Sequence, residues 1–197
     1  ERRRFAQQSH EYLIEQLQYQ TEGMANSVKL NLNHPVKELI FAVQSQSAIN
    51  ATPNGNAVAN VVGSVGQGND YFNYTSGTVD ANRQETINGQ TSDEGFDTFK
   101  LQLNGHDRFT ARKASYFRTV TPLYAGHRVP EKHVYCYSFA LKPEEHQPSG
   151  TCNFSRIDNA RMIFENGNTT TSNLNVYAVN YNVLRVMSGM GGLAYSN

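Results

Sequence analysis

The sequence predicts an all-β domain, built as an antiparallel sandwich of two sheets. Apolar and polar residues alternate with the two-residue period of a strand in roughly seven or eight short segments. Clusters of Gly, Pro, Asn and Asp separate these segments, as expected for the turns between antiparallel strands. Only one stretch, near the N-terminus, has the spacing of an amphipathic helix. A length of 197 residues suits one such domain with a sizeable core.

The helical candidate runs from Phe5 to Tyr19, and Gly23 is placed to end it. Residues three and four positions apart share one side of this helix: Phe5, Ser9, Tyr12, Leu13, Gln16 and Leu17. We therefore predict a short N-terminal connector helix within residues 1–26, followed by the sandwich in residues 27–197. The basic run Arg2–Arg4 is predicted to be solvated rather than to form a nucleic-acid arm.

Two alternating segments follow, Val28–Leu32 and Val36–Gln44, with Asn33-His34-Pro35 between them. Pro35 cannot donate to a ladder and restricts His34 to an extended backbone. A bent strand is predicted, with a bulge or a switch between sheets at this point. His34 has no partner at a useful spacing for metal binding.

The segment from Ser45 to Gly95 is rich in Asn, Gly, Ser, Gln and Thr and predicts long, outward-facing loops. Its glycines Gly63, Gly66 and Gly68 lack the Gly-Lys-Ser/Thr ending of a phosphate loop. Phosphate binding is therefore not predicted.

Phe96–Leu103 alternates again and predicts a strand, and Gly105-His106-Asp107 predicts a turn. Phe109–Pro122 interleaves aromatic and basic residues, which suits either base stacking or the border of a core with charged tips in water. The chain has 17 basic and 17 acidic residues. Because this balance gives no net positive electrostatic field to attract nucleic acid, we favour the interpretation that Phe109–Pro122 borders the core. We predict no direct nucleic-acid contact.

Charge is uneven along the chain, with acids concentrated in Asp80–Asp97 and Lys/Arg in Lys100–His133. Solvated loops are the favoured interpretation, and complementary edges between copies of the chain are the alternative. Arg112 and Lys113 are the basic residues that this alternative would use. No apolar run is long enough to predict a membrane-spanning helix.

Several residues are candidates for catalytic or metal-binding groups. In Leu123–Lys132 and just beyond, His127, Glu131 and His133 have the wrong order and spacing for a cupin-type metal site. The polar corner residues Glu144, Glu145 and His146 are expected to be solvated. Neither Ser149 nor Cys152 lies in a nucleophile-elbow frame. We therefore predict no catalytic, cofactor-binding or metal site, and no enzyme activity.

The central unit is Val134–Ile163. Val134–Leu141 predicts a strand, and the prolines and glycine of Lys142–Gly150 predict a corner before a second strand near Thr151. Cys136 and Cys152 fall on these two arms and would lie close together if the arms paired. Free, reduced thiols are favoured.

Asn153–Phe164 alternates as one strand, and we predict a structural ion pair using Arg156 or Asp158. Leu174–Met187 predicts a long final strand. The glycine-rich Gly189–Gly192 is not expected to hold regular structure by itself, but to dock on a neighbour or fray.

Four segments carry a family resemblance. They are Tyr137–Pro143 (YSFALKP), Gln147–Asn159 (QPSGTCNFSRIDN), Asn33–Ile40 (NHPVKELI) and Asn180–Arg185 (NYNVLR). They resemble the second, C-terminal jelly roll of the double jelly-roll major capsid proteins of large nucleocytoplasmic DNA viruses, iridovirus type.

The resemblance implies that residues 27–197 form a jelly roll and that residues 1–26 connect it to a preceding one in a longer product. It implies a structural capsid protein that forms homotrimers of pseudo-hexagonal outline in an icosahedral shell. Neighbouring capsomers and minor capsid proteins would be its partners, in a virion assembled in the host cytoplasm. The alternatives are a carbohydrate-binding jelly-roll module and, more remotely, a metal-dependent enzyme.

Overall fold

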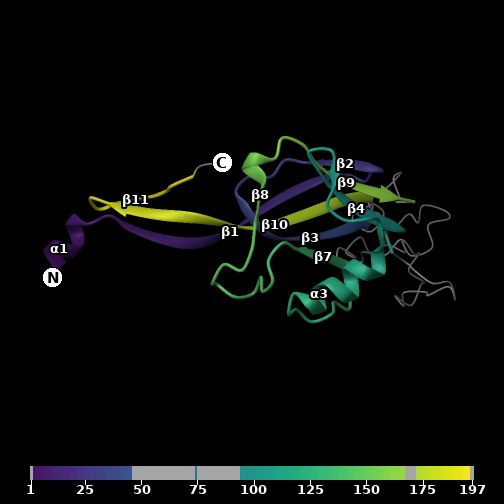
Figure 1. Ribbon diagram of the computed structural model, residues 1–197, viewed down its shortest axis with the longest axis horizontal. Coiled ribbons are helices and arrows are strands. Elements are labelled where there is room, and N and C mark those ends of the chain that lie inside the picture. Colours follow the sequence, from purple (N-terminus) through teal and green to yellow (C-terminus); the bar gives the residue numbers. More distant parts are fainter. Residues whose placement is uncertain (1, 46–73, 75–93, 167–171, 196–197) are drawn as a thin grey trace, which may run out of the picture.

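The computed structural model describes residues 2–45, 74, 94–166 and 172–195, and they form a sandwich of two antiparallel sheets (Figure 1). The predicted fold class, an antiparallel jelly-roll sandwich, is confirmed. Most of the predicted loop region Ser45–Gly95 lies outside the described residues, as does most of the acidic segment Asp80–Asp97.

The first sheet has the strand order β1-β10-β3-β7, with β11 also paired to β10 and β8 also paired to β3. Its strands are β1 (His10–Gly23), β3 (Pro35–Ser45), β7 (Val134–Ser138), β8 (Cys152–Asn153), β10 (Ser172–Met187) and β11 (Met190–Leu193).

The second sheet has the order β2-β9-β4-β5, with β6 also paired to β4. Its strands are β2 (Ser27–Leu30), β4 (Thr98–Leu103), β5 (His106–Asp107), β6 (Arg112–Lys113) and β9 (Ala160–Glu165). The helical segments are α1 (Arg2–Gln7), the π-helix η1 (Tyr116–Val120), α3 (Thr121–Tyr124) and the 3-10 turn η2 (Phe154–Arg156).

Aromatic rings from both sheets fill the space between them. Phe41 of β3 lies 5.0 Å from Phe99 of β4, centroid to centroid, and Phe99 stacks on Phe164 of β9 at 5.2 Å. All three side chains are buried, as is Tyr135 of β7. The predicted core border at Phe109–Pro122 is also confirmed, because Phe117 of η1 is fully buried and contacts Phe99 at 4.9 Å.

The predicted switch between sheets at Asn33-His34-Pro35 is confirmed. β2 pairs with β9 in the second sheet, whereas β3 pairs with β10 and β7 in the first. The extended backbone predicted for His34 is wrong, because His34 makes the bend between the two sheets with a positive φ of 64°, a region that residues other than glycine adopt only occasionally. The β3–β10 register also shifts between Val179 and Asn180, so Lys37 is an extra, bulged residue.

The helix predicted over Phe5–Tyr19 is wrong for most of its length. A helix is present only in α1, and the chain from His10 onward is strand β1, paired with β10 over its whole length. Apolar and polar residues also alternate with a two-residue period from Gln16 to Gln20 (QLQYQ), so part of the segment fits a strand as well as a helix. Pairing with β10 gives hydrogen-bond partners to the backbone N–H and C=O groups of β1. This tertiary pairing outweighs the helical spacing of the side chains. That residues 1–26 follow a preceding domain stays a prediction.

The two arms of the central unit do not pair with each other. β7 pairs with Glu38–Ala42 of β3, and β8 pairs with Pro35–Val36, so both arms lie along the same edge of β3. The corner at 142–150 is free of strand, as predicted, and Cys136 and Cys152 are both free thiols.

The single strand predicted for Asn153–Phe164 is split by η2, after which the chain crosses to β9 in the second sheet. Arg156 and Asp158 are exposed on this crossing, and among the described ion pairs none uses either residue. The predicted structural ion pair is therefore wrong, because both side chains stay in water.

The final strand β10 is confirmed, but the glycine-rich end does not fray. Ser188 and Gly189 both have positive φ, at 52° and 79°, the combination of a two-residue hairpin turn. β11 thus pairs with β10 of the same chain, Met190 opposite Met187. The turn supplies a partner strand that composition alone does not reveal.

Candidate interaction surface and buried polar clusters

A ribbon of strands extends well beyond the sandwich (Figure 1). Here the first half of β1 pairs with the second half of β10, and β11 pairs with β10 on its other side. We call this ribbon, together with α1 at its tip, the arm: residues 2–15 and 181–195. Thin ribbons without a covering layer are only marginally stable in water, so the arm is expected to be covered by other polypeptide.

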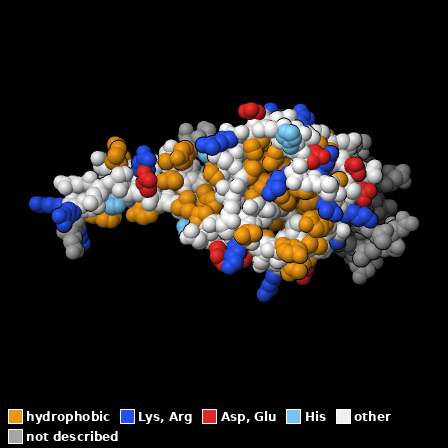
Figure 2. All heavy atoms as spheres, in the orientation of Figure 1, with side chains coloured by type: hydrophobic (Ala, Val, Ile, Leu, Met, Phe, Trp, Pro, Cys, Tyr) orange, Lys and Arg blue, Asp and Glu red, His pale blue; other side chains and the backbone are white. Residues whose placement is uncertain are grey.

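The arm exposes large apolar side chains, which are visible along it in Figure 2. Tyr12 is 50% exposed and Met190 is 75% exposed. The full set of exposed large hydrophobic residues on the arm is Phe5, Tyr12, Leu13, Met187, Met190, Leu193 and Tyr195. Contiguous exposed apolar surface marks interaction sites in water-soluble domains. The arm is therefore the candidate interaction surface.

The outer face of the first sheet continues this surface toward the sandwich. Leu17 is opposite Val179, and Tyr19 is opposite Tyr177, which in turn is opposite Ile40 of β3. Tyr19 and Tyr177 stack with 4.9 Å between ring centroids, and Leu17 is 62% exposed. These five residues form an apolar outer strip on the sheet.

The base of the arm is anchored to the sandwich by a buried ammonium group. The bulged Lys37 is 3% exposed, and its Nζ donates to Glu15 Oε1 at 2.7 Å. The same Nζ lies 5.5 Å from the ring centroid of Tyr181. Further out, Arg185 and Glu11 pair at 2.7 Å, but both side chains are half exposed, so this pair contributes little.

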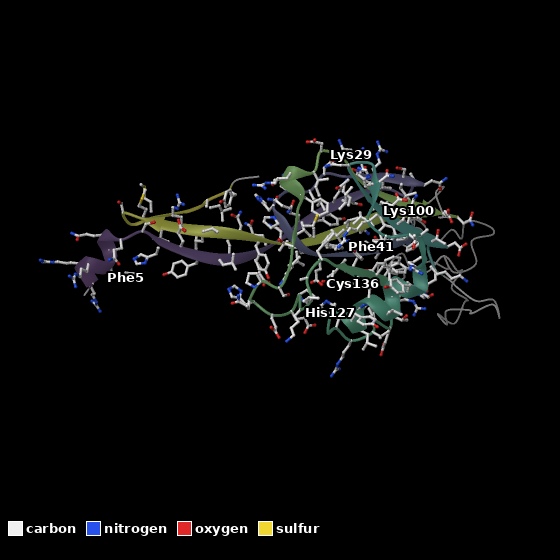
Figure 3. The ribbon with its side chains drawn as sticks, viewed as in Figure 1. Phe5, Lys29, Phe41, Lys100, His127 and Cys136 are labelled. Atoms are coloured by element: carbon white, nitrogen blue, oxygen red, sulfur yellow. The ribbon has the colours of Figure 1, made fainter. Side chains whose placement is uncertain are left out.

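A first buried polar cluster joins β3 and β7 to the loop after α3. His127 Nε2 lies 2.8 Å from Glu38 Oε2, and His127 Nδ1 lies 2.6 Å from Glu144 Oε1. The Cys136 thiol donates weakly to Glu38 Oε2 at 3.8 Å. Glu38 and Cys136 are buried, and His127 is partly exposed. Figure 3 shows His127 and Cys136 on the sandwich, away from Phe5 at the tip of the arm.

This environment changes the acidity of both titratable donors. Burial alone would lower the pKa of His127, but the hydrogen bonds to Glu38 and Glu144 outweigh it and raise the pKa above its ordinary value. Burial, reinforced by the Glu38 carboxylate, raises the pKa of Cys136 to about 12. In this arrangement the thiol stays protonated, which is the opposite of an activated nucleophile.

A second buried cluster holds η1 against the core. Tyr135 Oη donates to Glu94 Oε2 at 2.6 Å, and Arg118 Nε donates to Glu94 Oε1 at 2.8 Å. Glu94 is 7% exposed, and burial together with its negative charge raises the pKa of Tyr135. Both carboxylate oxygens thus have partners, as a buried charge requires. We assign this cluster a structural role.

The candidate metal ligands His127, Glu131 and His133 are not brought together, whereas His127 does contact Glu144, a candidate from the polar corner. His127 contacts Glu38 and Glu144 rather than Glu131 or His133, whose Nε2 instead lies 3.9 Å from Glu94. Glu38 was not singled out from sequence. The sequence signal for Glu38 is a charged residue within a strand that is otherwise mostly apolar. The described part of the chain contains no helix long and apolar enough to cross a bilayer.

Comparison with known proteins identifies the family. The model for the large eukaryotic DNA virus major capsid protein matches residues 1–192. Major capsid proteins of Pyramimonas orientalis virus, Paramecium bursaria Chlorella virus 1 and Phaeocystis pouchetii virus are 45%, 44% and 42% identical over 100% of this chain. The matches cover 46%, 51% and 51% of those proteins, so the chain spans about half the length of the curated relatives it matches.

Solved structures of viral capsid proteins also match this chain. The quasi-atomic model of the PBCV-1 virus capsid matches with a TM-score of 0.67 and 39% identity, covering 100% of this chain and 54% of that one. The Faustovirus major capsid protein shares the fold, with a TM-score of 0.64 at 17% identity over 89% of this chain and 33% of that one. The resemblance read from the four sequence segments is confirmed: this chain belongs to the family of large eukaryotic DNA virus major capsid proteins.

Proposed function

We propose that this chain is a structural part of a viral major capsid protein and that its role is to build the shell of a virion. The observation that carries the proposal is the match over the whole chain to named major capsid proteins at 42–45% identity, on a sandwich fold. The relatives named by these comparisons are capsid proteins, which supports a capsid role over the alternative of a carbohydrate-binding module. The same relatives support a structural rather than an enzymatic role, which we include in the proposal.

In this proposal the sandwich is a stiff block and the contacts lie on its exposed surfaces. The full-length subunit has two jelly rolls, with residues 1–26 connecting this one to the preceding one. Three subunits form a homotrimer of pseudo-hexagonal outline, and trimers contact neighbouring capsomers and minor capsid proteins in an icosahedral shell. Assembly takes place in the host cytoplasm. Modest contacts suffice, because each is repeated many times over the shell.

The arm and the outer strip supply the apolar part of these contacts. Removing one exposed Leu, Met or Tyr side chain from water contributes about 1.5–3 kcal/mol. Two such side chains therefore change an association constant by roughly two orders of magnitude or more. The exposed Arg112 and Lys113 of β6 are the basic candidates for charge pairing between copies, which stays a prediction.

The test uses the full-length polypeptide that contains this chain. Native mass measurement and negative-stain imaging are expected to give trimers of hexagonal outline. A Tyr12→Ser/Met190→Ser variant of the arm is expected to weaken subunit association at least ~10-fold. The matched control is Tyr124→Ser/Leu141→Ser, which removes two side chains that are 83% and 79% exposed and lie off the arm.

Two outcomes would contradict different parts of the proposal. A full-length product that stays monomeric at high concentration while catalysing a reaction would overturn the capsid role. Trimers that form equally well with the arm variant and with the control would leave the capsid role standing and remove the arm from the interface.

A further inference from the structure

We propose that Glu38, His127 and Cys136 form a zinc-binding site that fastens the loop after α3 to the outer face of the first sheet. Their ligand atoms, a carboxylate oxygen, the imidazole Nε2 and the thiol Sγ, all lie within 4.8 Å of one another. This site borders the outer strip, because Cys136 is opposite Ile40 and Glu38 is opposite Val179. Its test measures metal binding rather than assembly, so it is independent of the capsid role.

Two of the ligands are placed by strand register. Glu38 is opposite Ser138, and Ile40 is opposite Cys136, so Glu38 and Cys136 are diagonal neighbours on one face of the β3–β7 pair. Their side chains point away from the aromatic core, where Leu39 and Phe41 pack. Register of this kind fixes both groups on rigid elements, which is what a metal site needs.

The third ligand, His127, lies in the loop that follows α3. Ala125 is buried and Gly126 has a φ of 88°, a left-handed conformation that turns the chain back toward the sheet. His127 Nε2 then reaches within 2.8 Å of Glu38 Oε2. Ligand atoms around a tetrahedral zinc ion stand somewhat farther apart than this, given bonds of about 2.0–2.3 Å, so a small side-chain adjustment admits the ion.

Glu144 supplies a second, independent indication. Its carboxylate accepts a hydrogen bond from the other ring nitrogen, His127 Nδ1, at 2.6 Å. Histidine ligands commonly donate this second N–H to a carboxylate, which fixes the tautomer and directs Nε2 at the metal. Glu144 itself is 62% exposed and comes from the 142–150 corner, so it is a positioning residue rather than a ligand.

The donor set and the charges favour zinc. One thiolate, one imidazole and one carboxylate match the ligands of Zn²⁺, whereas Mg²⁺ and Ca²⁺ prefer oxygen ligands alone. On binding, the Cys136 thiol releases its proton to solvent and the sulfur coordinates the ion. The thiolate and the Glu38 carboxylate then balance the two positive charges in a mostly buried place. Water from the exposed side of His127 completes the fourth position.

The experiment measures metal binding by the full-length, metal-stripped protein. We expect one equivalent of Zn²⁺ per chain, and with Co²⁺ as a probe the absorption band of a thiolate–cobalt bond. Cys136→Ser is expected to abolish that band. The matched control, Cys152→Ser, removes the half-buried thiol outside the cluster and is expected to keep both the band and the stoichiometry.

Glu144→Gln keeps the protein folded, because the side chain is exposed, and tests the positioning role. We expect it to weaken zinc binding ~10–100-fold while leaving the cobalt–thiolate band in place at saturation. Zinc should also raise the melting temperature of the wild type but not of Cys136→Ser. The proposal is overturned if the wild type takes up no stoichiometric zinc, or if Cys136→Ser and Cys152→Ser bind it equally. Should Cys136→Ser fail to fold, an unchanged zinc affinity in Glu144→Gln would overturn it instead.

Discussion

Removing the hydroxyl of Tyr135 should destabilise the sandwich by about 1.5–3 kcal/mol. This hydroxyl donates to Glu94 Oε2 at 2.6 Å, in a place where Tyr135 is 0% and Glu94 is 7% exposed. Tyr135→Phe keeps the ring against Phe41 and deletes only the donor. A hydrogen bond to a buried charged group contributes about 1.5–3 kcal/mol. Its loss leaves the buried Glu94 Oε2 with a longer contact, to His133 Nε2 at 3.9 Å.

The measurement is thermal unfolding of the full-length protein at one fixed concentration. For a domain of this size, each kcal/mol changes the melting temperature by about 2–4 °C, so a decrease of roughly 3–12 °C is expected. Tyr124→Phe is the matched control, because this tyrosine is 83% exposed, and a change within about 0.5 kcal/mol is expected there.

A double-mutant cycle separates the hydrogen bond from the packing of the ring. Combining Tyr135→Phe with Glu94→Gln should cost clearly less than the sum of the two single changes, because the two groups contact each other. Additive costs, or a Tyr135→Phe effect no larger than that of the control, would refute the assigned structural role of this carboxylate.

Three further changes have expected outcomes on the same unfolding assay. Phe99→Ala removes a fully buried ring between the sheets and should cost about 3–5 kcal/mol; a cost under 1 kcal/mol would show that the aromatic core is not packed as described. Gly150→Ala should cost about 1–3 kcal/mol, because φ is 146° and a Cβ would meet the Phe139 carbonyl oxygen at 2.7 Å; a neutral result would contradict this close approach. Arg185→Gln breaks the half-exposed pair with Glu11 and should change stability by less than about 1 kcal/mol, with any effect disappearing at high salt.

The sequence by itself determined those features that depend on local alternation and turn chemistry. The strands at 28–32, 36–44, 96–103 and 174–187 were predictable because one face of each is buried, which gives a two-residue period. Pro35 marked the switch between sheets, since it removes a ladder donor. The four segments that resemble capsid proteins also identified the family, which no argument from composition would have reached.

Only the tertiary structure decided which segments meet. The spacing of residues 5–19 fits a helix, and part of it fits a strand as well, but pairing with β10, at the other end of the chain, makes most of this segment a strand. His127 and Glu38 are 89 residues apart, and their contact depends on the β3–β7 register and on the turn at Gly126. Likewise, the sequence of the central unit suggests that its two strands, β7 and β8, form a hairpin, but both pair with β3 instead. Each of these outcomes depends on a partner distant in sequence, and periodicity within a segment carries no information about that partner.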